Sequence, residues 1–459
     1  MSGSPRPEAA AVRPYQFPAV HRHRLGNGLR VVVAPMQRLP LVTAMALVDA
    51  GAVEDPVGAE GLAALTARTL DEGSGSLDGA ALTELFESLG TAFEASADWD
   101  SSVARITVMP QHLDSAFARF AEVLRAPSFP DRDVARRRDE RLDDLAQALA
   151  EPRGLADMRF VGFLYEPTAR FAHPAGGDRR SVSLLDRDGV RSFHATRYRP
   201  AVTTLVFVGD ITPEDALRLA ESRFGDWQGA PAAPTAAAAD AVRRGRRSVL
   251  VAKPGAPQSE LRIGHRGVPR GHPDYLAIVV MNAILGGLFS SRINLNLRER
   301  NAFTYGASSG FDWRRAAGPF VVSTAVQSDV TDRAVQEVLR ELDAIRESPP
   351  TANELSLATD YLAGVFPIRY ETTAAVAGAI GGAIVYGLPD NWFETYRDRV
   401  QAVTAADVHA AARAVIDPGQ LLVLAVGDAD AVSKPLESIE HGALKVVMAT
   451  DDPTETGTA

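Results

Sequence analysis

The stretch 61–74, GLAALTARTLDEGS, begins with apolar residues at helical spacing and predicts a helix over 61–70. It lies between the apolar runs LVTAMALV (41–48) and VARITV (103–108), which predict strands. A second helical pattern, GAALTELFESL, covers 79–89. Grouped strands with helices packed to one side are typical of an α+β sandwich.

Further elements flank this region. The turn 26–28 (GNG) leads into the apolar run LRVVVA (29–34), which predicts a first strand. Later in the chain, 136–149 reads as a long, highly charged helix that ends before Pro152. A chain of 459 residues is too long for one ordinary hydrophobic core, so we expect two or more domains.

Composition limits the classes of function. A net charge of −10 argues against nucleic acid or an anionic membrane as the main partner. The sequence contains no cysteine, which excludes disulfides, thiolate zinc sites and a cysteine nucleophile. The first residues lack the apolar core of a secretory signal, and prolines interrupt any amphipathic transit helix. We therefore expect a cytoplasmic protein, with a periplasmic or organellar location left open.

One apolar stretch needs a separate interpretation. The run AAVAGAIGGAIVYGL (374–388) is the longest series of small apolar residues in the chain. It is too short and too rich in glycine to cross a bilayer. We therefore expect it to form a tightly packed helix.

The Ala- and Pro-rich stretch 229–247 is typical of a surface linker. The two halves of the chain on either side of it share a repeated motif. In the first half, FHA (193–195) leads through an apolar strand into the Gly-Asp pair 209–210. In the second half, VHA (408–410) leads likewise into the Gly-Asp pair 427–428. This repetition predicts a duplicated α/β sandwich. The expected division is an extension (1–20), a first domain (21–228), the linker (229–247), a second domain (248–445) and a tail (446–459).

The stretch 61–74 resembles the zinc helix of the pitrilysin/insulinase/mitochondrial-processing-peptidase family, which reads roughly G-x-A-H-F-L-E-H-M-x-F-x-G-T. In that family the inverted H-x-x-E-H motif binds zinc through two histidines, and its glutamate acts as general base on the metal-bound water. Here the histidine positions fall on Ala64 and Arg68, and the glutamate position on Ala67. A methyl group cannot ligate zinc, and a guanidinium keeps its proton. Four other positions match the family's frame: Gly61, Ala63, Gly73 and Ser74.

The resemblance extends over 24–428 through short motifs whose order and spacing match those of the family. In the first half these are Leu25, Asn27, Gly28 and Leu29, then His173 and Pro174, then Phe193, Tyr198, Pro200, Gly209 and Asp210. In the second half they are Pro254, Gly255, Gln258 and Ser259, then His272, Pro273 and Asp274, then Leu285, Gly286, Gly287, Ser290, Ser291, Arg292, Leu297, Arg298, Glu299 and Tyr305. The resemblance implies two homologous α/β sandwich domains that form one side of a clamshell chamber.

The family's third zinc ligand is a glutamate on a later helix. Here the charged helix RRRDERLDDLAQALAEP offers Glu140, Asp143 and Asp144 at the corresponding place. Without two histidines a lone carboxylate is a poor zinc site, so a solvated helix face is the simpler interpretation. The other histidines suggest no replacement site, because they lie singly or alternate at a strand start: His21, His23, His112, His194, His265, His272, His409 and His441.

Two residues of the second half retain a functional interpretation. In the family, an arginine and a tyrosine at the positions of Arg298 and Tyr305 reach across a cavity toward zinc held by another domain. A guanidinium and a phenol donate hydrogen bonds to a substrate carbonyl as it becomes an oxyanion. The alternative is structural: Arg298 pairs with a helix carboxylate and Tyr305 packs at a strand edge. The short link 286–290 lacks the long glycine-rich loop of the mitochondrial non-catalytic subunit, so presequence processing is not implied.

The resemblance therefore implies the non-catalytic subunit of a bacterial heterodimeric zinc peptidase. This chain would carry no metal or cofactor of its own. Its expected partner is a homologue with an intact H-x-x-E-H, which would hold the zinc. The two chains would enclose unfolded peptide, and Arg298 and Tyr305 would contact the substrate carbonyl in trans. No nucleic acid partner and no membrane span are expected.

Three alternatives stay open at this level. The chain could be a structural scaffold of the same fold, with no peptidase role. It could bind unfolded peptide alone, without cleavage, as a chaperone-like module. It could also be an active enzyme with a relocated metal site, for which the sequence supplies no evident ligand cluster.

Overall fold

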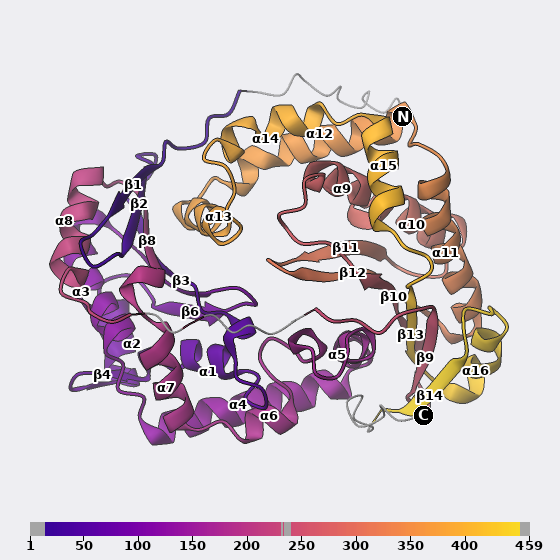
Figure 1. The fold of residues 1–459 in the computed structure, drawn as a ribbon, viewed down its shortest axis with the longest axis horizontal. Coiled ribbons are helices and arrows are strands. Elements are labelled where there is room, and N and C mark those ends of the chain that lie inside the picture. Colours follow the sequence, from indigo (N-terminus) through magenta and orange to yellow (C-terminus); the bar gives the residue numbers. More distant parts are fainter. Residues whose placement is uncertain (1–13, 231–232, 234–239, 450–459) are drawn as a thin grey trace, which may run out of the picture.

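The computed structural model describes residues 14–230, 233 and 240–449, and in these ranges the chain forms two six-stranded sheets (Figure 1). In the N-terminal half the strand order is β1-β2-β8-β3-β7-β6, and in the C-terminal half it is β11-β12-β10-β13-β9-β14. The N-terminal strands are β1 (His21–Arg24), β2 (Arg30–Pro35), β3 (Val42–Val48), β6 (Glu94–Ala97), β7 (Ser102–Val108) and β8 (Thr203–Gly209). The C-terminal strands are β9 (Arg247–Ala252), β10 (Gln258–Arg266), β11 (Ala307–Trp313), β12 (Ala317–Gln327), β13 (Leu422–Gly427) and β14 (Leu444–Met448). A small hairpin joins β4 (Gly73–Ser74) to β5 (Leu77–Asp78).

Helices pack around both sheets. Those of the N-terminal half are α1 (Leu62–Arg68), α2 (Gly79–Ser88), α3 (Leu113–Arg125), α4 (Asp131–Ala150), α5 (Pro152–Leu164), α6 (Arg179–Ser183), α7 (Arg187–Arg197) and α8 (Pro213–Phe224). Those of the C-terminal half are α9 (Tyr275–Asn282), α10 (Arg292–Asn294), α11 (Thr331–Glu347), α12 (Ala352–Arg369), α13 (Thr373–Val385), α14 (Trp392–Gln401), α15 (Ala405–Val415) and α16 (Ala429–Glu437). Two π-helices, η6 (Ala283–Gly287) and η7 (Leu295–Arg300), flank α10. The predicted α+β class and the duplicated sandwich are confirmed.

The two sheets repeat one topology. Strand β8 pairs in parallel with β2 and antiparallel with β3, and β13 pairs in the same two ways with β9 and β10. The hairpin β6–β7 then extends the first sheet, as β11–β12 extends the second. Only the outermost strand differs, since β1 runs antiparallel to β2 whereas β14 runs parallel to β9. Apart from the outermost strand, the two halves therefore share both the order and the direction of their strands.

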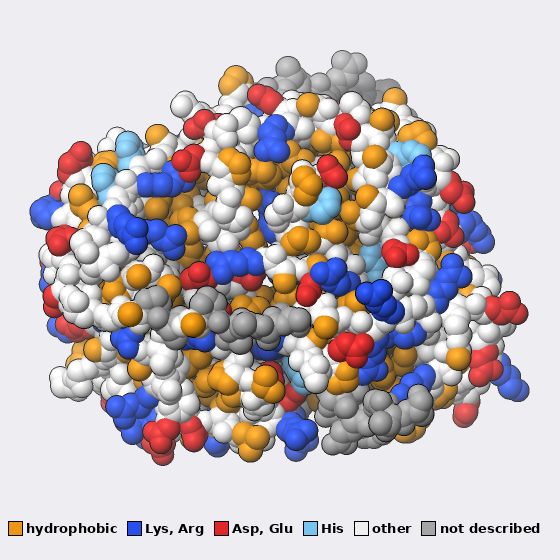
Figure 2. All heavy atoms as spheres, viewed as in Figure 1, with side chains coloured by type: hydrophobic (Ala, Val, Ile, Leu, Met, Phe, Trp, Pro, Cys, Tyr) orange, Lys and Arg blue, Asp and Glu red, His pale blue; other side chains and the backbone are white. Residues whose placement is uncertain are grey.

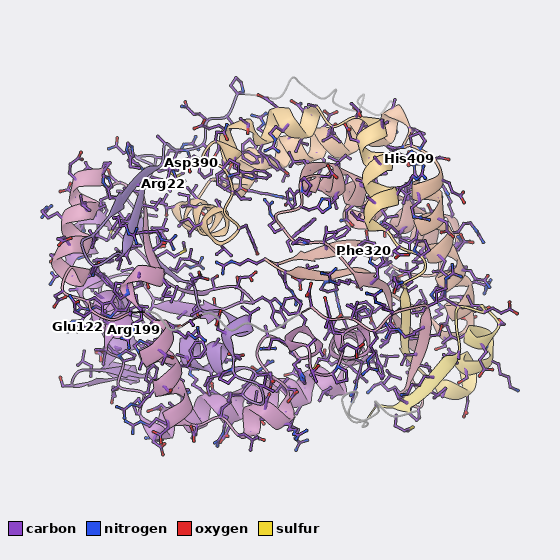
Figure 3. All side chains as sticks on the ribbon, viewed as in Figure 1. Arg22, Glu122, Arg199, Phe320, Asp390 and His409 are labelled. Carbon is purple, nitrogen blue, oxygen red and sulfur yellow. The ribbon has the colours of Figure 1, made fainter. Side chains whose placement is uncertain are left out.

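Two histidines make the same contact in the two halves. The Nε2 of His194 on α7 lies 2.9 Å from the carbonyl oxygen of Leu124, near the end of α3. The Nε2 of His409 on α15, labelled in Figure 3, lies 2.8 Å from the carbonyl oxygen of Arg346, near the end of α11. Each imidazole thus binds one of the carbonyls that a helix terminus leaves unsatisfied.

One helix of each half packs on the sheet of the other half. Helix α13, from the C-terminal half, packs on β3 and β8, where Ile380 joins a buried cluster with Val206. Helix α5, from the N-terminal half, packs on β10 and β13, where Leu155 joins a buried cluster with Leu424. Figure 1 shows α13 beside the N-terminal sheet and α5 beside the C-terminal sheet. Every residue of β8 and β13 is buried, as strands covered on both faces require.

The tips of two equivalent hairpins also meet. Arg315, between β11 and β12, donates its backbone N–H to the carboxylate of Asp100, between β6 and β7, at 3.0 Å. The Arg315 side chain pairs with Asp49. The guanidinium of the buried Arg314 lies 3.9 Å from the ring centre of Trp99. Arg314 and Arg315 of one tip therefore contact Trp99 and Asp100 of the other, and Asp49 just after the end of β3.

The domain edges differ in detail from the expected division. Within the extension 1–20, Phe17 is buried and stacks on Phe393 of α14 with 4.2 Å between ring centres. Strand β14 runs to Met448, so the boundary expected after 445 falls inside a strand and is too early. Strand β9 begins at Arg247, the last residue of the expected linker. Residues 1–13, 231–232, 234–239 and 450–459, which include part of the linker and most of the tail, lie outside the described residues.

Helix α13 confirms the interpretation of the apolar run 374–388 as a tightly packed helix. A Cβ on Gly381 would lie 3.0 Å from the Cε of Met45, so the helix approaches β3 closely because this residue has no side chain. Among the described residues, 275–300 is long and apolar enough for a membrane-crossing helix. That stretch is interrupted between η6 and α10, and much of it belongs to the core of the C-terminal half. Figure 2 shows acidic and basic side chains interspersed over one face of the molecule.

Candidate functional site

The helix that resembles the zinc helix begins at a buried carboxylate. Asp55 accepts the backbone N–H groups of Gly61 and Ala63, both at 2.8 Å, so it caps the N-terminus of α1. The guanidinium of the buried Arg170 binds the same carboxylate at 2.9 Å. Burial raises the pKa of Asp55 to about 6, against the effect of Arg170 and of the two N–H donors. This pair, which the sequence analysis missed, fixes where α1 starts.

Arg170 also organises the loop that contains the His-Pro motif. It donates hydrogen bonds to the carbonyl oxygens of His173, Pro174 and Ala175 at 3.3, 3.1 and 2.9 Å. The His173 ring lies 2.8 Å from Asp178, and this hydrogen bond raises the pKa of the histidine. The motif therefore encloses a structural arginine. In the sequence, the one signal for the structural role of Arg170 was its position after a helix and before the His-Pro motif.

The zinc-ligand positions on α1 hold residues that cannot bind a metal. Ala67 is fully buried and Ala64 partly buried, and neither methyl group has an electron pair to offer. Arg68 directs its guanidinium to Asp144 on α4, with 3.3 Å between Nη1 and Oδ2. Within the described residues, no group of three or more His, Asp or Glu side chains is arranged to hold a metal ion. This donor set does not fit zinc.

The three carboxylates expected near the third-ligand position make different contacts in the structure. Glu140 pairs with Arg136 at 2.6 Å and with Arg137 at 3.0 Å, and both arginines also bind the buried Glu72. Asp143 is exposed. Asp144 alone of the three contacts the second histidine position, through Arg68. An ion pair therefore joins α1 to α4 where the family would place a metal ion.

Arg298 lies on the π-helix η7. Its guanidinium carbon is 4.3 Å from the ring centre of Phe289, and its Nη1 is 3.4 Å from the Oε1 of Glu299. The Glu299 contact resembles the structural alternative, but Glu299 is more than half exposed and such pairs contribute little to stability. The Nη1 atom is shielded from solvent and makes no hydrogen bond within the described residues. Nη1 therefore faces Glu299, and the partly exposed guanidinium offers an outside acceptor only its other N–H groups.

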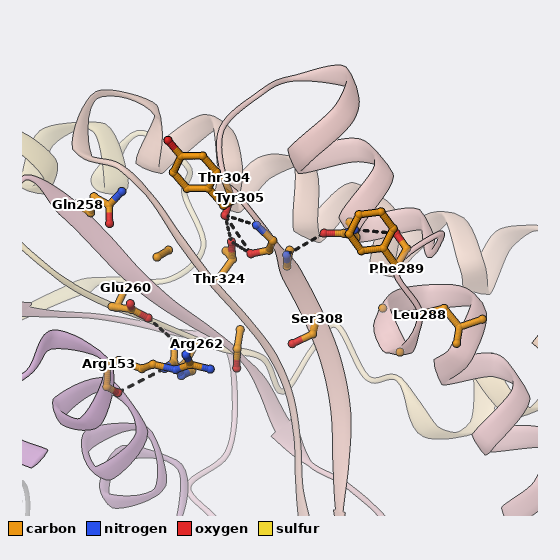
Figure 4. Close-up of a pocket in the computed structure, with 17 residues that line it drawn as sticks. Arg153, Gln258, Glu260, Arg262, Leu288, Phe289, Thr304, Tyr305, Ser308 and Thr324 are labelled. Carbon is orange, nitrogen blue, oxygen red and sulfur yellow. Dashed lines mark hydrogen bonds and ion pairs between the residues drawn. The ribbon is translucent and has the colours of Figure 1, made fainter. Parts of the chain in front are cut away.

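Tyr305 does not pack at a strand edge. It is 94% exposed and precedes β11 by two residues, in a loop that borders a groove of about 530 Å³ (Figure 4). Phe289 lines the same groove, whereas Arg298 does not line it and reaches it through that ring. The structure therefore places Tyr305 and Phe289 at one groove and Arg298 behind the Phe289 ring.

The floor of the groove is one polar face of the C-terminal sheet. Alternate residues of β10 contribute Gln258, Glu260 and Arg262, and the neighbouring strand β12 contributes Ser323 opposite Arg262. The Arg262 side chain is 3% exposed and is held by Asp157 of α5 at 2.6 Å and by Glu260 at 2.9 Å. These floor residues were missed as functional candidates. The signal was the polar alternation in QSELRIGHR, where every second side chain faces the same side.

The zinc-ligand positions on α1 lie in the N-terminal half, whereas Arg298 and Tyr305 lie in the C-terminal half (Figure 1). Helix α1 packs against α7, β6 and α4, whereas η7 packs against α10 and α11. The structure thus pairs Arg68 with Asp144 at one site, and places Tyr305 and Phe289 on the lining of one groove at the other. A duplicated α/β sandwich with an inverted-motif helix that lacks its ligands is the fold of a metallopeptidase without a metal site.

Comparison with known proteins agrees with this class. Residues 30–170 match the model for Insulinase (Peptidase family M16), and 185–362 match the model for the Peptidase M16 inactive domain. An uncharacterized zinc protease of Mycobacterium tuberculosis is 24% identical over 416 residues, which cover 89% of this chain and 92% of the relative. The zinc protease PqqE of Helicobacter pylori is 23% identical and covers 79% of this chain and 82% of its own length.

Solved structures show the same fold. A crystal structure of a peptidase M16 inactive domain from Pseudomonas fluorescens superposes with a TM-score of 0.82 at 27% identity, over 89% of this chain and 98% of the other. A protease from Helicobacter pylori gives the same TM-score at 18% identity, over 90% and 100%. The chain belongs to the pitrilysin/insulinase family, peptidase family M16. It is a non-catalytic member, because Ala64, Ala67 and Arg68 replace the residues that the family's zinc chemistry needs.

Proposed function

We propose that this chain is the non-catalytic subunit of a heterodimeric zinc peptidase, and that it works in the cytoplasm. Its partner is a homologue of similar length that bears an intact H-x-x-E-H and holds the zinc. This chain supplies one wall of the peptide-binding chamber. It also supplies Arg298 and Tyr305 as donors to the substrate carbonyl in trans.

The observation that carries the proposal is the contrast between the two sites. The helix that resembles the zinc helix is capped by Asp55, and its Arg68, at the position aligned with the second histidine, forms an ion pair with Asp144. At the other site, Tyr305 is almost fully exposed at a groove, and the partly exposed Arg298 guanidinium lies over Phe289, which lines that groove. A chain with donors for an oxyanion and no means to generate a nucleophile needs a second chain for hydrolysis.

The chemistry assigned to this chain is electrostatic. As the partner's zinc-bound water attacks a peptide carbonyl, negative charge develops on the carbonyl oxygen. The Arg298 guanidinium and the Tyr305 hydroxyl donate hydrogen bonds to that oxygen. Extended peptide would be held by strand addition to a sheet edge of the partner, which leaves the carbonyl facing this chain.

The test is co-expression with a homologue that has the intact motif, followed by a peptide-cleavage assay on the purified pair. Arg298→Ala and Tyr305→Phe should each lower kcat on the order of 10²-fold, as expected for the loss of one oxyanion donor. Matched controls are Arg300→Ala, an exposed arginine of the same π-helix, and Tyr361→Phe, a half-exposed tyrosine of α12. If both site variants cleave as fast as the wild-type pair, the trans role is wrong.

A second candidate function is peptide binding without cleavage. The open groove favours it, because a polar sheet face bordered by an exposed tyrosine suits an extended peptide. The isolated chain would then bind unfolded peptide, and Tyr305→Ala would weaken that binding. A purely structural scaffold predicts neither binding nor cleavage with any partner. Calorimetry on the isolated chain and cleavage by the pair together separate the three roles.

A further inference from the structure

Phe289 is an exposed aromatic residue with one evident contact. Its side chain is 71% exposed in the link between η6 and α10, and it lines the groove that Tyr305 borders (Figure 4). The guanidinium carbon of Arg298 lies 4.3 Å from its ring centre. A single exposed apolar side chain is common on protein surfaces, so the contact with Arg298, and not exposure alone, indicates a role for this ring.

The backbone around Phe289 is held rigidly. The buried Asn294 donates its side-chain amide to the Phe289 carbonyl oxygen at 2.6 Å. On the other side, Asn282 donates to the Ser309 carbonyl oxygen at 3.0 Å and accepts from the Ser309 hydroxyl at 2.8 Å. A Cβ on Gly286 would lie 2.4 Å from the Ser309 Oγ, so only glycine allows this approach to β11. The ring therefore projects from a fixed support.

The pair also lies between two rare elements. The π-helix η6 ends just before Phe289, and Arg298 is part of the π-helix η7. Such segments have a less favourable backbone than α-helix and occur mostly at functional sites. Here they bring two residues nine positions apart in the chain into stacking contact.

We propose that Phe289 is a positioning residue that holds the Arg298 guanidinium flat, with its in-plane donors directed at the substrate carbonyl. The inference rests on the proposed function, since it concerns the same trans contact. A guanidinium stacked on a ring keeps its N–H groups available at the edge, because the ring occupies only one face. Without the ring, the exposed Glu299 carboxylate, 3.4 Å from Nη1, is the one remaining contact within the described residues that holds the flexible guanidinium.

The first experiment measures kinetics of the co-purified pair. Phe289→Leu should lower kcat about fivefold and leave KM within about twofold, because the oxyanion forms only in the transition state. Phe289→Tyr keeps the ring face and should restore the rate. In an Arg298→Ala background, Phe289→Leu should cause no further loss, since its effect passes through the arginine. Ile368→Ala, an apolar residue 64% exposed on α12, is the control for surface hydrophobicity.

The second experiment needs no partner. The ring current of Phe289 should shift the side-chain NMR signals of Arg298 in the isolated chain, with the assignment made from their loss in Arg298→Lys. Phe289→Leu should abolish the shift, and Phe289→Tyr should preserve it. A stacking role without catalytic consequence would show the NMR change but unchanged kcat, and that result would overturn the inference.

The two proposals fail in different ways. If Arg298→Ala is slow but Phe289→Leu is as fast as wild type, only the positioning role is wrong. If Arg298→Ala itself is silent in the pair, the proposed function falls and the positioning role falls with it. If Phe289→Leu and Phe289→Tyr are equally slow, or if the loss persists in the Arg298→Ala background, Phe289 acts by packing and the inference is rejected.

Discussion

The carboxylate of Asp100 accepts the backbone N–H of Arg315 at 3.0 Å, and this bond joins the tips of two equivalent hairpins. Asp100 lies between β6 and β7, and Arg315 lies between β11 and β12, so duplicated elements contact each other across the molecule. An outer ion pair between Arg22 of β1 and Asp390 adds a second link between the halves at 2.9 Å (Figure 3). Both of its partners are exposed, so the buried hairpin contact matters more.

Removal of the Asp100 carboxylate should loosen the contact between the halves. Asp100→Ala leaves the Arg315 N–H without its charged acceptor and should lower the free energy of unfolding by about 1.5 kcal/mol. Urea denaturation followed by circular dichroism measures this change. Asp114→Ala, which removes an exposed partner of Arg223, should stay within about 0.5 kcal/mol of wild type. Equal effects of the two variants would contradict a specific role for the hairpin contact.

The exchange of α5 and α13 should make the two halves unfold together. Ile380→Ala and Leu155→Ala each create a cavity where a helix of one half covers the sheet of the other. Each should lower the free energy of unfolding by about 2–5 kcal/mol and shift one common transition. Calorimetry provides the measurement, and Ile368→Ala on the exposed face of α12 is the matched control. Two separate transitions, of which a variant moves only one, would mean that the halves are independent.

The geometry of the lost metal site should be recoverable. Position 68 already contacts Asp144, and position 64 lies one helical turn earlier on the same face of α1. We expect Ala64→His combined with Arg68→His to bind about one zinc ion per chain, with Asp144 as third ligand. Elemental analysis after dialysis measures this, with wild type and Arg68→His alone as controls that retain none. A folded double variant that binds no zinc would show that α1 and α4 do not place positions 64, 68 and 144 close enough to share a metal ion.

Acid should destabilise the protein through His194. Burial lowers the pKa of His194 to about 4, from the ordinary 6.5. The unfolded chain therefore takes up a proton between these values that the folded chain does not, so stability falls as the pH drops from about 6.5 toward 4. Between pH 7 and pH 5 this group should account for about 2 kcal/mol of lost stability.

His194→Gln tests that assignment, because glutamine keeps a donor for the Leu124 carbonyl but does not titrate. The variant should be less stable than wild type at pH 7 and should lose about 2 kcal/mol less on transfer to pH 5. Urea titrations of both proteins at the two pH values give the comparison. Parallel losses in both proteins would assign the acid sensitivity to other groups.

Local sequence patterns predicted most of the elements that position the site. The helix at 61–70 appears as α1 and the strand at 41–48 as β3, because side-chain periodicity reports directly which face is apolar. The charged helix begins earlier than expected, at Asp131 after Pro130, since its first turn carries a single apolar residue, Val134, and no apolar periodicity. The choice of Asp144 among three carboxylates was not predictable, because it depends on where α4 crosses α1.

Side chains of the groove show the same limit. Arg298 and Tyr305 were found through short motifs, yet Phe289, which contacts Arg298, was missed because an isolated phenylalanine carries no signal of its own. Its meaning comes from the two π-helices that bring it to Arg298. The buried pair of Asp55 and Arg170 could not be predicted either, because more than one hundred positions separate its two members in the sequence.

The sequence by itself determined that the inverted-motif helix has no zinc ligands, because ligation requires an electron pair that Ala64, Ala67 and protonated Arg68 do not offer. It also indicated a duplicated fold, through the helix, strand and Gly-Asp turn repeated at 193–210 and 408–428. Only the tertiary structure decided that α5 and α13 exchange between the halves and that Arg298 stacks on Phe289. An apolar pattern specifies that a face must be covered, and the packing of distant segments selects which one covers it.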